Sequence, residues 1–143
     1  MLRLTPVVLF LGACASLPGQ GETLANSHWQ LLSIQSMDDA QGTTRVPDPA
    51  RYTLSFGKDG RASLRLDCNR GSGSWQAEAA TPTSGRLSFG MLATTRAMCM
   101  PGSLEPRLAR DLPHVRGYLQ KDGKLYLTLQ ADGGIYEWAP AAP

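Results

Sequence analysis

Cysteine is the residue type with the most informative placement in this sequence. Of 143 residues, three are cysteines, at positions 14, 68 and 99. A thiol can be acylated, oxidised to a disulfide or used as a nucleophile, and its surroundings decide which of these happens. There is no Cys-x-x-Cys pair, and no histidine lies close in sequence to Cys68 or Cys99. The spacing therefore favours structural or anchoring roles over redox or nucleophilic catalysis.

Cys14 closes an N-terminal segment that has the pattern of an export signal. One basic residue, Arg3, precedes an apolar run over residues 4–13, which is too short for a bilayer that needs about 20 residues. The final Leu-Gly-Ala-Cys resembles the lipobox of bacterial lipoproteins, in which the cysteine becomes the acylated N-terminus. We therefore expect residues 1–13 to be a lipoprotein signal peptide and Cys14 to be lipidated. The alternative is an ordinary signal peptide that ends by chance at a cysteine.

Lipidation of Cys14 would attach the protein to a membrane. Each buried CH₂ group of an acyl chain contributes about 0.8 kcal/mol, so several chains together form a stable anchor. Ala15, rather than an aspartate, follows the cysteine, and the resemblance to lipoproteins then implies the outer membrane. We expect anchoring at the periplasmic face of the bacterial outer membrane. Residues 14–27 are mostly small and polar with interspersed Gly and Pro, and are expected to form a flexible tether.

Cys68 and Cys99 remain available for a disulfide. Exported proteins fold in an oxidising compartment, where two remaining cysteines usually pair. Such a bridge would close a loop of about 30 residues and contribute roughly 3–4 kcal/mol in the chain-entropy model. Free thiols are the alternative. If the bridge forms, Asn69, Arg70 and Arg96 lie near it, either to hydrogen-bond loop backbone groups or to bind a ligand.

Other residue patterns offer little support for catalysis. The two histidines, His28 and His114, are far apart in sequence, whereas a zinc site needs three or four N or S ligands, so we expect no metal site. Gly71–Ser74 lacks the Gly-x-Ser-x-Gly pattern of a nucleophile elbow, and we expect it to form a turn between strands. Asp38 and Asp39 fall in a long polar loop. We therefore expect no enzyme activity and no cofactor.

The charge balance argues against one further class of function. The chain carries 14 Lys and Arg residues against 12 Asp and Glu residues, spread along its length. A strongly electrostatic nucleic-acid binder would show a concentrated basic patch. Nucleic acid is therefore not an expected partner.

Short alternating strands are expected to position these residues. Apolar and polar residues alternate in segments separated by turn signals such as Lys58–Gly60 and Lys121–Gly123. The expected strands cover residues 29–34, 52–56, 62–68, 75–79, 87–89, 118–120, 125–129 and 135–138. Leucines at every fourth position predict one helix over residues 104–112, which Ser103 can cap and Pro113 ends. The pattern predicts a mostly β domain over residues 28–139, an antiparallel barrel-like or sandwich fold with one α-helix.

The motifs around the cysteines resemble those of the META domain family. The similar segments are Trp29–Ile34 (WQLLSI), Cys68–Trp75 (CNRGSGSW), Thr94–Cys99 (TTRAMC) and the helix opened by Glu105. The resemblance implies an antiparallel β-barrel-like domain with one helix and no established enzyme activity. Members of the family, which include a heat-shock lipoprotein, are linked to the bacterial envelope and to stress. This chain has Asp67 where the family usually has glycine before the cysteine, and Asp adopts positive φ less readily than Gly.

The expected function is that of a non-catalytic binding module with a role in envelope maintenance or stress. Its partner would be an envelope protein, or a small apolar ligand held by aromatic residues at a barrel mouth. Two alternatives remain open. A lipocalin-like carrier of small hydrophobic ligands would need an open cavity inside the barrel. An inhibitor of a hydrolase would need an exposed loop, for which residues 37–50 are the candidate.

Overall fold

Ten strands and one short helix form the domain. The computed structural model describes Gly12 and residues 24–143, so Cys14 and nearly all of the predicted signal peptide lie outside the described residues. The elements are β1 (Ser27–Gln35), β2 (Thr43–Arg45), β3 (Tyr52–Phe56), β4 (Arg61–Leu66), β5 (Asn69–Ala79), β6 (Ser84–Phe89), β7 (Ala93–Thr94), α1 (Glu105–Asp111), β8 (Val115–Lys121), β9 (Lys124–Leu129) and β10 (Ile135–Pro140). Within this described part of the chain, no helix is both long and apolar enough to cross a membrane.

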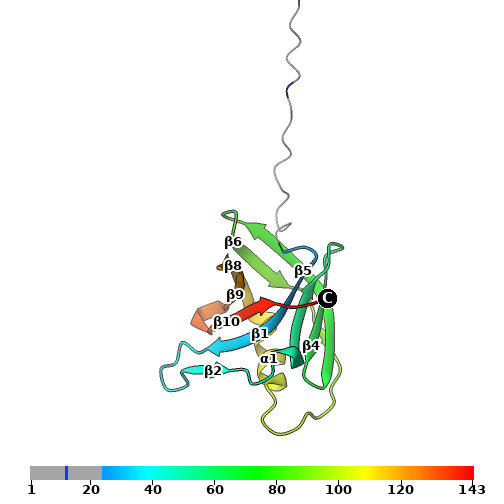
Figure 1. The fold of residues 1–143 in the computed structure, drawn as a ribbon, viewed down its shortest axis with the longest axis vertical. Helices are drawn as coiled ribbons and strands as arrows, with labels where there is room; N and C mark the ends of the chain where they lie inside the picture. Colours follow the sequence, from blue (N-terminus) through cyan, green and yellow to red (C-terminus); the bar gives the residue numbers. More distant parts are fainter. Residues whose placement is uncertain (1–11, 13–23) are drawn as a thin grey trace, which may run out of the picture.

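Eight of the strands close into an antiparallel barrel (Figure 1). The strand order is β10-β9-β8-β6-β5-β4-β3-β1, and β10 returns to pair with β1. The short strand β2 pairs with the end of β1, and β7 pairs with β5. The predicted mostly β fold with one helix is confirmed, and the barrel is the form that it takes. Closure pairs the strands that would otherwise be open sheet edges.

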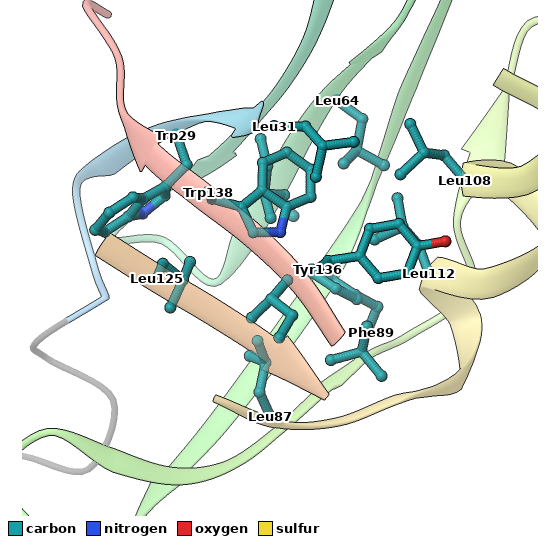
Figure 2. Close-up of a cluster of buried hydrophobic side chains, with 14 of the residues drawn as sticks. Trp29, Leu31, Leu64, Leu87, Phe89, Leu108, Leu112, Leu125, Tyr136 and Trp138 are labelled. Carbon is teal, nitrogen blue, oxygen red and sulfur yellow. The ribbon is translucent and has the colours of Figure 1, made fainter. Parts of the chain in front are cut away.

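Alternate residues along the strands fill the interior of the barrel. In β9, Leu125, Leu127 and Leu129 are buried while the residues between them are partly exposed. An eight-stranded barrel is narrow enough for its own side chains to fill. The largest fully buried side chains are Trp138, Tyr136, Phe56, Leu24, Leu31, Ile34, Leu54, Leu66, Leu87, Leu108, Leu112 and Leu125. Figure 2 shows part of this core around Trp138 and Tyr136. Burying a side chain of this size stabilises the fold by about 1.5–3 kcal/mol relative to leaving it exposed.

Helix α1 covers one end of the barrel. It occupies most of the predicted range 104–112, and a single 3₁₀ turn (Leu112–His114) continues it. Leu108 and Leu112 are fully buried, which confirms the inward-facing leucine stripe. The Ser103 hydroxyl accepts a hydrogen bond from the Glu105 N–H at 3.2 Å. The Tyr136 hydroxyl reaches the helix from β10 and donates to Asp111 at 2.5 Å, so the helix is fixed to the barrel by both apolar and polar contacts.

The predicted turn at Gly71–Ser74 is wrong, because this segment lies inside β5. The strand before α1 crosses closely over these glycines. A Cβ atom on Gly73 would lie 2.7 Å from the Met91 carbonyl oxygen, and one on Gly71 would lie 3.0 Å from a methyl of Thr94. Glycine is therefore needed here for close approach of two backbones, rather than for a turn.

The folded domain begins earlier than the predicted boundary at residue 28. Leu24 is fully buried in the core, and the Asn26 N–H donates to the Phe56 carbonyl at 2.7 Å. At the other end, β10 continues to Pro140, and the Ala141 N–H donates to the His28 carbonyl at 2.9 Å. Residues 24–27, which were predicted to belong to the tether, are therefore part of the barrel.

Candidate functional site

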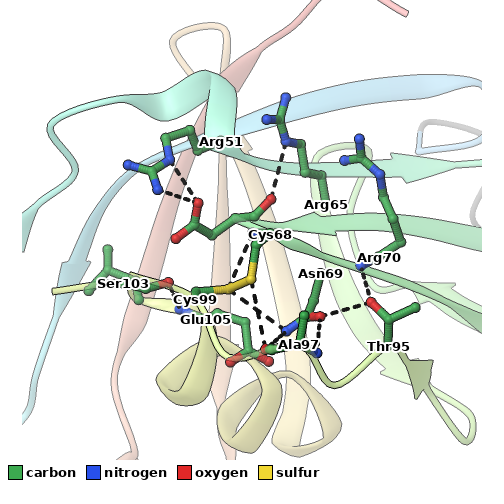
Figure 3. Close-up of a disulfide and its surroundings, with 12 residues drawn as sticks. Arg51, Arg65, Cys68, Asn69, Arg70, Thr95, Ala97, Cys99, Ser103 and Glu105 are labelled. Atoms are coloured by element: carbon green, nitrogen blue, oxygen red, sulfur yellow. Dashed lines mark hydrogen bonds and ion pairs between the residues drawn. A yellow bond between two sulfur atoms is a disulfide. The ribbon is translucent and has the colours of Figure 1, made fainter. Parts of the chain in front are cut away.

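The disulfide joins two segments at the end of the barrel that α1 covers. Cys68, in the turn between β4 and β5, is bonded to Cys99 in the long loop between β6 and α1, with 5.5 Å between their Cα atoms (Figure 3). That separation lies within the usual range for a disulfide. The predicted pairing is confirmed. The bridge ties the loop of residues 90–103 to the barrel wall.

Asn69 fixes the same loop by hydrogen bonds. Its side chain is 1% exposed. The amide nitrogen donates to the Ala97 carbonyl at 2.9 Å, and the amide oxygen accepts from the Ala97 N–H at 2.8 Å and from the Thr95 hydroxyl at 2.9 Å. Figure 3 shows the amide facing the loop. Of the two predicted roles for Asn69, the loop-structuring role is the one that these contacts support.

Arg70 and Thr95 continue this attachment through the backbone. The Arg70 N–H donates to the Thr95 hydroxyl at 2.9 Å, and the Thr95 N–H donates to the Arg70 carbonyl at 2.9 Å. The residue Arg70 is otherwise exposed. Its main chain therefore helps to hold the loop, and its guanidinium group is available at the surface.

Asp67 forms the turn that precedes the disulfide. Its φ of +59° lies in the left-handed region, so the tight turn persists although Asp replaces the glycine that is usual in the META family. The carboxylate accepts hydrogen bonds from Nε of Arg51 at 2.8 Å and from Nη2 of Arg51, and the Asp67 N–H donates to the Arg51 carbonyl at 2.8 Å. The Ser103 hydroxyl and Arg51 lower the pKa of Asp67. The side chain of Asp67 thus binds the segment that contains Arg51, which a glycine could not do.

Three methionines stand out from this fixed loop. Met91, Met98 and Met100 are 94%, 98% and 75% exposed. The far end of the loop is also held, because the Leu104 N–H donates to the Tyr52 hydroxyl at 2.9 Å. We call residues 90–103 the methionine loop. Sequence reasoning did not single it out, although three methionines between positions 91 and 100 were a visible signal.

Arg96 lies between Thr95 and Ala97, which both bond to Asn69, and it also lines a neighbouring recess. This recess has a volume of about 290 Å³ and lies between α1 and the barrel. The recess is lined by Leu64, Leu66, Leu92, Thr94, Arg96, Glu105, Ala109, Leu112 and Pro113. Six of these nine residues are apolar, and Arg96 and Glu105 add one cation and one anion. Asn69 and Arg70 therefore help to hold the loop, whereas Arg96 forms part of the wall of a recess.

Two of the residues considered for catalysis or metal binding, His28 and Asp38, have polar contacts within the domain. Nδ1 of His28 lies 2.9 Å from the Ser55 hydroxyl. The Asp38 carboxylate accepts a hydrogen bond from the Ala40 N–H at 3.0 Å within an exposed loop. Among the residues that the structure describes, no group of three or more His, Cys, Asp or Glu side chains is placed to hold a metal ion.

Comparison with known proteins adds a family and a set of similar folds. The family model of the META domain matches residues 22–141. A protein from Burkholderia xenovorans, solved by NMR, is 24% identical and has a TM-score of 0.66, with 99% of this chain and 100% of that chain covered. A crystal structure of a DUF4847 family protein from Bacteroides vulgatus is 14% identical and has a TM-score of 0.56, with 83% and 95% covered. No curated protein matches the chain.

Proposed function

We propose that this chain, which belongs to the META domain family, is an outer-membrane-anchored periplasmic lipoprotein. Its barrel would be a non-catalytic binding module. Its role would lie in envelope maintenance or the response to stress. The lipid anchor at Cys14 holds the barrel at the membrane, and the barrel presents a contact surface to an envelope protein. The methionine loop is that surface.

The exposure of the methionine loop is the observation that carries this proposal. Exposed large apolar side chains that form a patch usually mark a contact surface, and the three exposed methionines lie within ten residues of one loop. Methionine is also flexible and polarisable, so it adapts to the surface of a partner. Met91, Met98 and Met100 are presented by a loop that a disulfide and Asn69 hold in place. A fixed loop loses less conformational entropy on binding than a mobile one.

The position of the methionine loop is consistent with an anchored protein that binds a partner. Figure 1 shows the loop before α1 at the end of the barrel opposite the place where the described chain begins at residue 24. An anchor on the N-terminal side would therefore leave the loop directed away from its own attachment point. The loop would be free to meet a protein in the periplasm.

The carrier alternative receives less support from the structure than the binding module. A lipocalin-like carrier needs space inside the barrel for its ligand. Here Trp138, Tyr136 and Phe56 are fully buried within the core, together with the leucines around them. These large side chains fill much of the barrel interior, although a recess of about 680 Å³, lined in part by Trp75, Leu87 and Val115, is also present.

Site-specific crosslinking in cells tests the proposed contact surface. A photoreactive residue at position 98, in the methionine loop, is expected to form a discrete adduct with an envelope protein. Position 119 provides the matched control, because Leu119 is also apolar and 39% exposed but lies on β8. Adducts of the same pattern from both positions, or none from position 98, would contradict the proposal.

A further inference from the structure

A second recess lies on the outer wall of the barrel, away from the disulfide. We call it the wall recess. It has a volume of about 230 Å³ and is lined by Ser33, Gln35, Thr43, Arg45, Tyr126, Ile135 and Glu137. These residues come from β9, β10, β1 and β2, which lie side by side in Figure 1.

The strand register brings all of these lining residues into two neighbouring rows. In the first row, Tyr126 is paired with Glu137, Glu137 with Ser33, and Ser33 with Arg45. In the second row, two residues further along each strand, Ile135 is paired with Gln35 and Gln35 with Thr43. Residues two apart on a strand share a face, so the two rows form one continuous outer surface. The wall recess is thus a product of the closed sheet.

Glu137 is held in a fixed position within the first row. Its carboxylate accepts a hydrogen bond from the Ser33 hydroxyl at 3.0 Å and pairs with the Lys124 ammonium group at 2.8 Å. The charges of Glu137 and Lys124 balance one another. This leaves an oriented carboxylate that can accept further hydrogen bonds, since each oxygen has two lone pairs.

Arg45 and Tyr126 stand at the two ends of the first row and offer two other kinds of contact. Arg45 is exposed, and among the described residues its guanidinium group has no ion-pair partner. The recess therefore has one uncompensated positive charge. Tyr126 is half-buried on the outer face of β9 and supplies an aromatic ring beside the polar groups. Gln35 and Thr43, in the second row, add an amide and a hydroxyl that both donate and accept hydrogen bonds.

We propose that the wall recess binds a pyranose sugar that carries a carboxylate. One face of a sugar ring consists of C–H groups and packs against an aromatic ring such as Tyr126. The hydroxyls at the ring edge match the amide, hydroxyl and carboxylate groups of Gln35, Thr43 and Glu137. The sugar carboxylate pairs with Arg45, whose planar guanidinium group suits a carboxylate.

Charge distinguishes this ligand class from other anions. A phosphate would bring a larger negative charge beside Glu137, and the repulsion would offset its attraction to Arg45. An apolar carboxylic acid would form no hydrogen bonds with Gln35 and Thr43 and would gain less from the recess. A sugar acid satisfies the charge, the hydroxyl contacts and the aromatic contact together.

NMR titration of the barrel domain within the full chain tests this proposal. Methyl β-D-glucuronide and methyl β-D-glucoside differ in the carboxylate and are otherwise of similar size. We expect the glucuronide to shift the amide signals of residues 33–35, 43–45, 126 and 135–137, and to bind about tenfold more tightly than the glucoside. Benzoate, an apolar carboxylate, and inorganic phosphate serve as anionic probes that lack the sugar ring and its hydroxyls.

Two variants separate the contributions of charge and aromatic stacking. Arg45→Gln is expected to remove the tenfold preference for the glucuronide and to leave glucoside binding unchanged. Tyr126→Leu is expected to weaken the binding of both sugars at least tenfold. Arg61→Gln, an exposed arginine on β4 outside the recess, is the matched control and should behave like the wild type. Signal shifts elsewhere on the barrel, equal binding of both sugars, or equal binding of benzoate or phosphate would overturn the proposal.

Discussion

At the scale of single residues, Asn69 acts as a connector between the barrel wall and the methionine loop. Its side-chain amide bonds to both the N–H and the carbonyl of Ala97, as a neighbouring strand would do. Burial makes these bonds consequential, since a buried polar group that loses its partner costs about 1–3 kcal/mol. The loop therefore depends on one side chain as well as on the disulfide.

Replacing Asn69 with alanine is expected to lower the free energy of unfolding by about 2 kcal/mol, because Ala97 loses two hydrogen bonds to Asn69 and the Thr95 hydroxyl loses its acceptor. Chemical denaturation measures this change. Arg70→Ala at the adjacent exposed position is the control, and should change stability by no more than about 0.5 kcal/mol. Equal effects of the two substitutions would show that the Asn69 hydrogen bonds do not fix the loop. Faster amide exchange over residues 95–99 should accompany Asn69→Ala.

Asp67 gives the protein a contribution to stability that depends on pH. Its pKa is lowered in the folded state by the Ser103 hydroxyl and by Arg51, whereas an unfolded aspartate titrates near pH 3.9. The folded state therefore binds the proton less readily than the unfolded state. The contribution is present above about pH 3.9 and is lost as the pH falls through the lower pKa of the folded state.

Asp67→Asn is therefore expected to be less stable than the wild type at pH 7, and to lose less stability between pH 6 and pH 3. Asparagine also tolerates positive φ, so the turn itself can form. Urea denaturation at a series of pH values measures both effects. Asp122→Asn is the matched control, since Asp122 also has positive φ but is exposed in a hairpin turn. Parallel pH profiles for Asp67→Asn and the wild type would refute the role of this carboxylate.

At the scale of elements, the contact between β5 and the segment before α1 positions the methionine loop. The pair β5–β7 is short, with Gly71 opposite Thr94 and Ser72 opposite Ala93. Gly73 packs closely against Met91 and Leu92, since a Cβ atom on Gly73 would lie 2.7 Å from an atom of each. Because the obstructing atoms at Gly73 include a backbone carbonyl, the crossing segment cannot move aside as a flexible side chain would.

Gly73→Ala is accordingly expected to destabilise the domain by about 1–3 kcal/mol, the usual cost of forcing extra volume into a packed site. It should also increase amide exchange over residues 91–94. Ser72→Ala, at the preceding and exposed position of β5, adds no volume and provides the control. A Gly73→Ala variant with wild-type stability would mean that this close approach does not constrain the loop.

The elements that could be predicted from sequence are those specified by neighbouring residues. The hairpin of β3 and β4 was predicted from the alternation of Tyr52, Leu54 and Phe56 and from the turn at 58–60, and these strands do pair. The strands β2 and β7 were not predicted, because they have three and two residues and no periodicity of their own. They form only where β1 and β5 offer a partner.

The sites required more than local pattern. The disulfide could be inferred from the number of cysteines and the expected compartment, and Asn69 from its position next to Cys68. The wall recess could not be inferred in this way. Its residues come from two pairs of strands that are far apart in sequence, β1 with β2 and β9 with β10. Their alignment depends on a register shift between Leu31 and Ser33 when β1 meets β10. Such a bulge changes which residues share a face, and the alternation pattern does not reveal it.

At the scale of the whole molecule, the proposed anchor and the observed disulfide both require that the chain is exported from the cytoplasm. Acylation at Cys14 occurs on an exported chain, and oxidation of Cys68 and Cys99 needs an oxidising compartment. The position of Leu24 in the core leaves residues 14–23 between the anchor and the barrel. Ten extended residues reach at most about 35 Å, so the barrel would remain close to the membrane surface.

The intact mass of protein extracted from membranes, with thiol alkylation before and after reduction, tests these two features together. We expect the mass to show the loss of residues 1–13 and the addition of acyl chains. No thiol should react before reduction, and two should react afterwards, since acylated Cys14 has none.

Cys14→Ser should abolish membrane attachment while the disulfide still forms, because the barrel does not contain Cys14. An unlipidated wild-type chain would refute the anchor. Alkylation of Cys68 or Cys99 before reduction would instead refute the disulfide as the native state and make thiol chemistry at the methionine loop the next subject of study.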